Sequence, residues 1–482
     1  MKLKIILINL LAILLGSCCK TCIIHHEKVK YPESTRSGIK YIHDKTELSR
    51  IAWWKKLKDP QLNQFITQAL SCNNQIKSSY ATIEQAQAQL KTAQYAWIPT
   101  LDASANGFAG GTWNSHINPN GSLANNPFFA NRSNISFRGY YSGFVPSYTF
   151  NILNNINNIK AAKASLAIQQ AQTQSTKLGI ISQMSGTYFM LLSQREQLAV
   201  EKTLSRDLRK LRQLEKVRFQ KGASDIETIM SIDQQIAQEE AKIPQIENIV
   251  TQSENTIHLL LNQNPGPIAT HQRLHSLNLN HLIPQYLPSS VLKNRPDIMI
   301  ALNNLKRANA EIGVAYSAFF PTISLTGLVG KASVDLTNLL KISTNIWIAQ
   351  ATGATKIFNP SAYQNIKSAK AGFNATYYEY LQTLRSAFAD VDDNLTYAQK
   401  NRLSYLKIQK GYLAAKQAYT ISLTQYKAGA KDYRNVVNAK INLGRNQLSL
   451  LQEKAQLLDS IVQVYNAVAG GYDVDKCEGH CH

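Results

Sequence analysis

The chain has 482 residues, 44% of them hydrophobic and 17% charged, and its 52 Lys and Arg against 31 Asp and Glu give a net charge of +21. This hydrophobic fraction excludes a wholly disordered chain, and a mean hydropathy of −0.24 without a run of 18 apolar residues excludes a helical membrane protein. The basic excess favours anionic partners, which include nucleic acid, lipid head groups and anionic solutes.

The N-terminus predicts export. Residues 1–17 have the pattern of a signal peptide, in which Lys2 and Lys4 precede an apolar stretch too short to span a membrane as a mature helix. The sequence Leu15-Gly16-Ser17-Cys18 resembles the lipobox of bacterial lipoproteins, which makes Cys18 the predicted lipidation site. An ordinary signal peptide followed by an incidental cysteine is the alternative. Because neither of the two residues directly after Cys18, Cys19 and Lys20, is acidic, we expect an outer-membrane lipoprotein, for which nucleic acid is not an available partner.

The six cysteines predict no disulfide framework, because their spacings do not suggest one for so long a chain. Four residues at the C-terminus combine thiols and imidazoles, the ligands that zinc and copper accept: Cys477, His480, Cys481 and His482. A metal site there competes with a solvated tail or a disulfide, since chain ends are poorly ordered. We therefore predict no cofactor.

The sequence contains a tandem repeat. Residues 93–101 (AQYAWIPTL) are similar to residues 315–323 (AYSAFFPTI), and residues 218–225 (RFQKGASD) are similar to residues 425–432 (QYKAGAKD). The two motifs keep their order in each copy, but the first copy is longer by about fifteen residues. The turn-forming residues 114–131, rich in Asn, Pro and Gly, account for this insertion.

Each copy begins with a helix followed by two strands. The first helices are predicted at 60–96 and 295–318, and they end near Pro99 and Pro321 because proline cannot donate to the helix. Polar and apolar residues then alternate, as in a strand with one wet face and one apolar face. The predicted strands span about 100–109, 134–150, 322–329 and 344–358.

A long proline-free helix follows the strands in each copy. The stretch from Leu153 to Gln220 would span about 100 Å at 1.5 Å per residue. The second long helix has apolar residues at steps of three and four, the seam of a coiled coil: Leu381, Leu384, Phe388, Val391 and Leu395. Gly222 and Gly429 are predicted to reverse the chain, because glycine readily adopts the left-handed conformation. The return helices then span about 226–262 and 432–468.

Four strands per chain are too few to close a membrane barrel, since the smallest known barrels need about eight. An open sheet in lipid would leave edge amides unpaired, which costs several kcal/mol per group. If these strands enter a membrane, the chains must therefore assemble, and three chains would supply twelve strands.

Five motifs in order resemble the bacterial outer-membrane efflux protein (TolC-like) family, in its lipoprotein branch, over roughly residues 50–470. The motifs are Trp53-Trp54 with Asp59-Pro60-Gln61-Leu62, Asn294-Arg-Pro-Asp-Ile298, Ala308-Asn-Ala-Glu-Ile-Gly-Val-Ala315, Phe319-Phe-Pro-Thr-Ile-Ser-Leu-Thr-Gly327 and the helix Tyr380 to Leu395. The resemblance implies an α+β membrane protein that forms a homotrimer. Its strands would form a twelve-stranded β-barrel in the outer membrane of a Gram-negative bacterium, and its long helices a periplasmic α-barrel.

The resemblance also implies a function and its partners. The trimer would be the passive exit duct of a tripartite efflux system, joined by a periplasmic adaptor to an inner-membrane pump of the resistance-nodulation-division type. The helix tips that face the adaptor would contain Gly222, Ser224, Gly429 and Lys431. The exported substrate, whether drug, metal, solvent or peptide, is not specified.

The resemblance places the narrow periplasmic mouth of the duct just after the second tip, at Asp432, Arg434, Asn435 and Asn438. Family members often carry acidic groups there, so a cation-selective carboxylate ring is in doubt for this chain. Either Arg434 faces the axis and favours anions, or it pairs with Asp432 or a neighbouring helix.

Two other function classes have less support in the sequence. No nucleophile elbow, P-loop or His-Glu-x-x-His motif supports an enzyme, and Asp390, Asp392 and Asp393 lie on one helix, where a solvated face explains them. A periplasmic coiled-coil scaffold or adaptor without a channel is the alternative. The predicted division is a signal peptide at 1–17, an extended lipid-anchored segment at 18–59, repeats at 60–285 and 286–470, and a tail at 471–482.

Overall fold

A computed structural model describes residues 34–36, 38, 40–42, 50–111, 136–279, 282–284, 286–288, 294–339, 344–356 and 358–473. The predicted signal peptide, Cys18, the insertion at 114–131 and the C-terminal residues Cys477, His480, Cys481 and His482 lie outside this part of the chain.

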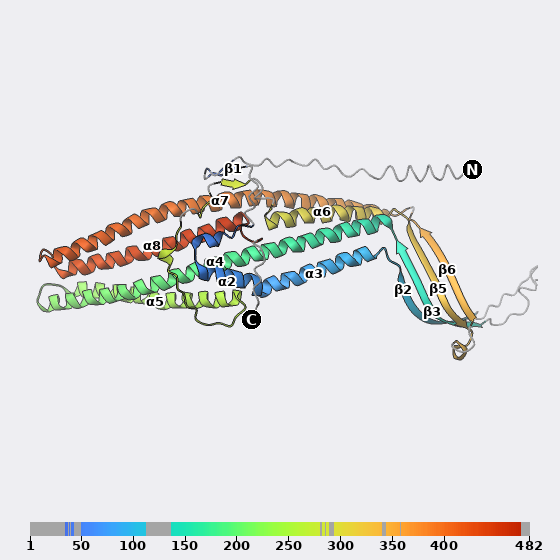
Figure 1. Cartoon of the computed structure of the whole chain (residues 1–482), viewed down its shortest axis with the longest axis horizontal. Helices are drawn as coiled ribbons and strands as arrows, with labels where there is room; N and C mark the ends of the chain where they lie inside the picture. Colours follow the sequence, from blue (N-terminus) through green and yellow to red (C-terminus); the bar gives the residue numbers. More distant parts are fainter. Residues whose placement is uncertain are drawn as a thin grey trace, which may run out of the picture.

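Two long helical hairpins run along the molecule, and a four-stranded sheet lies at one end (Figure 1). The first hairpin pairs α4 (Ile152–Gln220) with α5 (Ile226–Leu260), and the second pairs α7 (Pro360–Lys427) with α8 (Tyr433–Ala467). The 69 residues of α4 correspond to about 100 Å. Both hairpin tips therefore lie far from the sheet, at the opposite end of the molecule.

The tandem repeat is confirmed by the order of the elements. The series α3 (Asn74–Tyr95), β2 (Thr100–Gly111), β3 (Ser136–Phe150), α4 and α5 recurs as α6 (Pro296–Ser317), β5 (Thr322–Ser333), β6 (Thr344–Ala354), α7 and α8. The strands and return helices lie within a few residues of their predicted positions. Pro244 lies inside α5 without ending it.

The single helix predicted at 60–96 is wrong, because the chain breaks at Asn73 into α2 (Pro60–Cys72) and α3. The Asn73 side chain accepts hydrogen bonds from the backbone N–H groups of Gln75 and Ile76, which caps α3. Its amide also donates to the carbonyl of Leu260 at 3.0 Å. A contact 187 residues away thus stabilises the break.

The sheet is antiparallel throughout, in the order β2-β3-β5-β6. Each repeat contributes one hairpin, and the two hairpins join through β3 and β5. Within the described residues, β2 and β6 each keep one edge without a partner strand. A small parallel pair between β1 (Lys40–Ile42) and β4 (Tyr286–Pro288) was not predicted from the sequence, and neither were three short 3-10 helices, η2 (Trp53–Leu57), η3 (Leu274–Ser276) and η5 (Leu336–Asn338).

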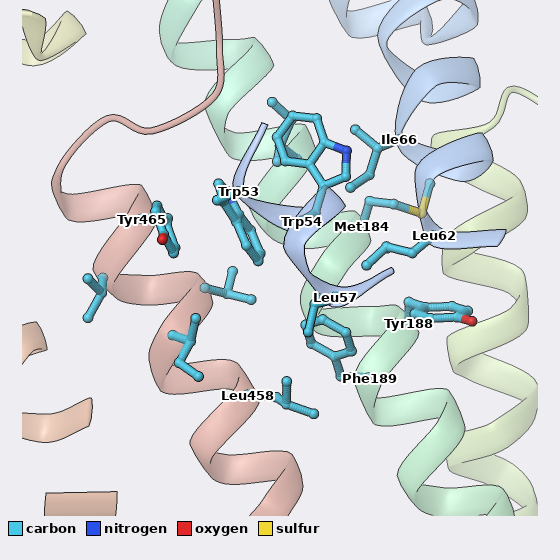
Figure 2. Packing of buried hydrophobic residues seen from close by; sticks show 14 of the residues in the cluster. Trp53, Trp54, Leu57, Leu62, Ile66, Met184, Tyr188, Phe189, Leu458 and Tyr465 are labelled. Carbon is cyan, nitrogen blue, oxygen red and sulfur yellow. The ribbon is translucent and has the colours of Figure 1, made fainter. Parts of the chain in front are cut away.

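The main core lies midway along the molecule. There the motif formed by Trp53, Trp54 and residues 59–62 packs between α4 and α8 (Figure 2). The ring of Trp53 stacks on Tyr465 of α8 with centroids 4.9 Å apart. Asp59 is fully buried, caps α2 through the N–H of Leu62, and accepts a hydrogen bond of 2.8 Å from Tyr188 of α4. Burial and this carboxylate raise the pKa of Tyr188. The motif therefore fastens the segment before α2 to both repeats.

Two features of the structure differ from the sequence expectations. Cys72 is disulfide-bonded. The expectation of no disulfide pattern missed this bond. The chain also stays packed to Tyr472, whose buried hydroxyl donates to the carbonyl of Asn294 at 2.7 Å, so the packed region extends into the predicted tail.

Lys454 is a buried cation in this core. Lys454 is 5% exposed, and its ammonium group donates hydrogen bonds to the carbonyls of His275 and Leu277, both at 2.9 Å. These bonds hold the connector that contains η3 against α8. Burial lowers the pKa of Lys454 to about 8.

We predict that this burial makes stability depend on pH. A lysine whose pKa is lowered on folding loses its proton in the native chain first, so native stability rises as the pH increases from about 8 toward the unfolded value of about 10.4. The free energy of unfolding of the wild type, followed by circular dichroism at a series of pH values, should rise over this range relative to that of Lys454→Met. The slope should approach the value for one proton per chain. Parallel pH curves for the two proteins would contradict the assignment.

Candidate functional site

The two hairpin tips close in the same way. Gly222 has a φ of 70°, its N–H donates to Phe219, and the N–H of Ala223 donates to Arg218, both at 2.9 Å. The second tip repeats both bonds around Gly429, whose φ is 73°. This double hydrogen bond is a Schellman motif, which requires a left-handed residue. Glycine at these positions thus ends the long helices and reverses the chain.

A network of charged side chains joins the first tip to the start of α8. The Glu215 side chain is 1% exposed and forms an ion pair with Arg434 at 2.9 Å. Ser224 donates to the same carboxylate at 2.8 Å. Arg218 forms a second ion pair across the tips, with Asp432 at 2.9 Å. The predicted tip residues Ser224, Asp432 and Arg434 therefore belong to one network.

The structure places Arg434 against the neighbouring helix α4, while its backbone N–H donates to Asp432 at 3.0 Å. A contact of this kind is one that the sequence left open for Arg434, and the position of its side chain relative to the axis of an assembled duct stays a prediction. Asn435, Asn438 and Lys431 are exposed. Asn438 and Arg434 also line a cavity of about 540 Å³ between α4, α5 and α8.

The sequence missed Glu215 and Arg218, because each looks like an ordinary solvated residue of a long helix. Their partners in α8 lie more than 200 residues away. Further ion pairs tie α4 to α5 and α8, and they include Arg209–Glu240, Lys202–Glu247 and Lys440–Asp207, each at 2.8 Å. Each of these pairs joins a basic side chain of one helix to an acidic side chain of another.

One face of the sheet is apolar from the helix end to the middle of the strands, and beyond that Ser142, Lys331 and Asn345 lie on it. The registers place Phe144 beside Val329 and Val329 beside Trp347, and all three side chains are exposed. On the other face near the helices, hydroxyls meet across the strands, as in the 3.0 Å contact between Thr149 and Ser324. An exposed apolar face opposite a polar one is typical of strands between lipid and water.

The described residues offer little for other chemistry. They contain no group of three His, Cys, Asp or Glu side chains that could hold a metal. Asp390 pairs with Arg295 and Asp392 with Arg36, while Asp393 is exposed, so the three aspartates of α7 do not gather into one site. None of the helices in this part of the chain combines the length and hydropathy needed to cross a bilayer.

Comparison with known proteins identifies close counterparts in architecture. A family model described as "Outer membrane efflux protein" matches residues 65–263 and 287–470. The solvent efflux pump outer membrane protein SrpC of Pseudomonas putida is 27% identical over 87% of both chains. The cation efflux system protein CusC of Escherichia coli K12 is 26% identical over 87% of this chain and 88% of its own. The Campylobacter jejuni CmeC outer membrane channel has the same fold, with a TM-score of 0.78, 24% identity and 95% coverage of both chains.

The tip geometry predicts that replacing a tip glycine by alanine lowers the free energy of unfolding, whereas replacing a glycine inside a helix raises it. An added Cβ would meet nothing within 4 Å at Gly222, Gly429 or Gly372, but only the first two have a positive φ. Gly222→Ala and Gly429→Ala should each lower the free energy of unfolding by about 1 kcal/mol. Gly372→Ala, inside α7, should raise it by up to about 1 kcal/mol. Denaturant titration measures all three, and equal effects would show that the left-handed conformation is not what the tips require.

The tip network predicts a strong coupling. Glu215→Gln removes the buried carboxylate that pairs with Arg434, and Arg434→Gln removes a cation from beside that carboxylate. Each variant should therefore lower the free energy of unfolding by about 1–3 kcal/mol. In a double-mutant cycle the pair should couple by more than about 1 kcal/mol. Lys202–Glu247, half-exposed and equally short, is the control, and it should couple by less than about 1 kcal/mol. Similar coupling in both cycles would remove the special role of Glu215.

Proposed function

The chain belongs to the outer membrane efflux protein family, and on that premise we propose that three copies form an exit duct joined by a periplasmic adaptor to an inner-membrane pump. The outer-membrane efflux channel predicted from the sequence is confirmed by this membership, in preference to a coiled-coil scaffold without a channel. The family is a class of channels and not of enzymes. The assembly, the partners and the lipid anchor are the parts that we propose.

The open edges of the sheet carry the proposal of a trimer. The exposed apolar face suits hydrocarbon, where an unpaired backbone group costs several kcal/mol. Strands alternate in direction across β2-β3-β5-β6, so β6 of one copy can pair antiparallel with β2 of the next. Two copies would give eight strands, which enclose a space that side chains fill, whereas three give twelve and leave room for a duct.

The helical part supports the same assembly. Four apolar side chains on the second half of α7 are exposed in the single chain: Leu403, Leu406, Leu413 and Ile421. Their spacing places them along one side of the helix, which suits the packing of another helix. A neighbouring copy would cover this stripe.

The tips support the proposed partners. With the sheet in the outer membrane, α4 would carry the tips about 100 Å into the periplasm. Gly222, Ser224, Gly429 and Lys431 would then face a periplasmic adaptor, and through it a pump of the resistance-nodulation-division type.

The experiment that tests the trimer links the proposed seam with cysteines. Ser104→Cys is combined in turn with a cysteine at each of four positions of β6: Ile346, Ile348, Gln350 and Thr352. At least one pair should give covalent dimers and trimers on oxidation. The control pair Ser147→Cys/Thr326→Cys joins β3 to β5, which are neighbours at this register, and should stay within one chain. Products from every seam pair that never exceed one chain would exclude the closed barrel.

Lipid attachment is predicted at Cys18 from the lipobox. Labelled palmitate should enter the wild-type protein and should not enter Cys18→Ser. Because the barrel itself would hold the trimer in the membrane, the exported variant should keep part of its efflux activity. Equal labelling of the two proteins would show that the anchor is elsewhere.

A further inference from the structure

The face of the sheet opposite the lipid changes character along its length. Near the helices it carries polar side chains at paired positions: Thr149, Ser324 and Thr352, then Thr100, Ser147, Thr326 and Gln350. Farther from the helices, the same face carries Tyr141, Leu328, Ile346 and Ile348, with Phe108 close to the end of β2 and Asn106 beside Tyr141. Contact with lipid explains the apolar face but gives no reason for apolar residues on this one.

These residues surround a cavity. It has a volume of about 700 Å³, and its lining includes Phe108, Tyr141, Leu328, Ile346 and Ile348. Phe108 and Ile348 are 54% and 55% exposed, so both present apolar surface to the open side. A volume of this size suits a solute with one or two aromatic rings.

Glycines shape this part of the sheet. Phe108 lies opposite Gly139 in the register, and a Cβ added to Gly139 would come within 2.6 Å of the Phe108 ring. The ring therefore lies close against the bare backbone of β3. Gly143 pairs with Gly330 on the same face, and there the two strands approach so closely that an added Cβ would collide with the partner backbone. Because both residues of this pair are glycines, no side chain separates Tyr141 from Leu328 at this point of the face.

The cavity has little net charge. Among the residues that the structure describes, Arg138 is the only charged one in the lining, and its guanidinium forms an ion pair of 2.7 Å with Asp335. A pocket of aromatic and aliphatic side chains with a neutralised cation favours uncharged apolar groups, because an ion would lose hydration without gaining a partner.

We propose that Phe108, Tyr141, Leu328, Ile346 and Ile348 form a binding site inside the duct for the apolar part of uncharged exported solutes. The site rests on the proposed trimer, in which this face lines the interior and the strand ends farthest from the helices lie at the outer mouth. Each copy contributes one site. Its partial exposure keeps binding weak, as passage through a duct requires.

The test measures how solutes block ion current through trimers in planar bilayers. The probe is N-phenyl-1-naphthylamine, which is uncharged, and its sulfonated relative 8-anilino-1-naphthalenesulfonate is the charged comparison. The neutral probe should block wild-type current at about tenfold lower concentration than the sulfonate. Phe108→Ser should weaken the neutral block by about tenfold and Ile348→Thr by about threefold, in proportion to the apolar area removed.

Val329→Thr is the matched control, because it replaces a β-branched residue that is 58% exposed on the opposite face of the same sheet. It should leave the block unchanged. If Phe108→Ser fails to form trimers, Ile348→Thr decides alone.

Each failure has a distinct meaning. Trimers that conduct and are blocked equally in all variants would place the solute elsewhere and overturn the site while the duct stands. An absence of block in conducting wild-type trimers would do the same, because another part of the assembly would then cover this face. A chain that forms no conducting trimer would overturn the proposed function and the site with it.

Discussion

The unpaired backbone at the two edges of the sheet is the constraint on which the rest of this structure depends. A sheet with an exposed apolar face suits lipid, and lipid does not tolerate free N–H and C=O groups. The tandem repeat supplies two hairpins, which pair with one another through β3 and β5 and leave β2 and β6 for other copies. In the proposed trimer, a single interaction, the ladder between β6 and the next β2, closes the wall, and the room that a duct needs sets the number of chains at three.

The helical part meets a different requirement. Its long helices must stay extended, although a single helix cannot bury a core by itself. A helix of 69 residues has no core of its own, so α4 is held at both ends and in the middle by other segments. At the middle, Trp53 stacks on Tyr465 and Asp59 binds Tyr188 (Figure 2). At the tip, Glu215 binds Arg434 across to α8. Apolar packing holds the middle and ion pairs hold the end, which suits an end that meets water and, in the proposed assembly, an adaptor.

The two faces of the strands separate two environments, and the inner one is not uniform. Hydroxyls line the part near the helices, while rings and branched side chains line the part near the strand ends. In the proposed trimer, a solute that leaves the helical duct would therefore first contact a wall lined by hydroxyl groups and afterwards a wall lined by apolar side chains. This order allows an apolar solute to stay associated with the wall as it approaches the outer mouth.

The sequence by itself determined the features that depend on neighbours along the chain. Proline and alternation located the four strands, the absence of proline located the long helices, and Gly222 and Gly429 marked the tips. Motifs spread over both repeats identified the family. Packing between distant segments sets four further features: the break at Asn73, the partner of Arg434, the buried Lys454 and the apolar stretch of the inner face. Each of these depends on groups on other strands or helices, many of them more than a hundred residues away, and propensity or periodicity along one segment carries no information about them.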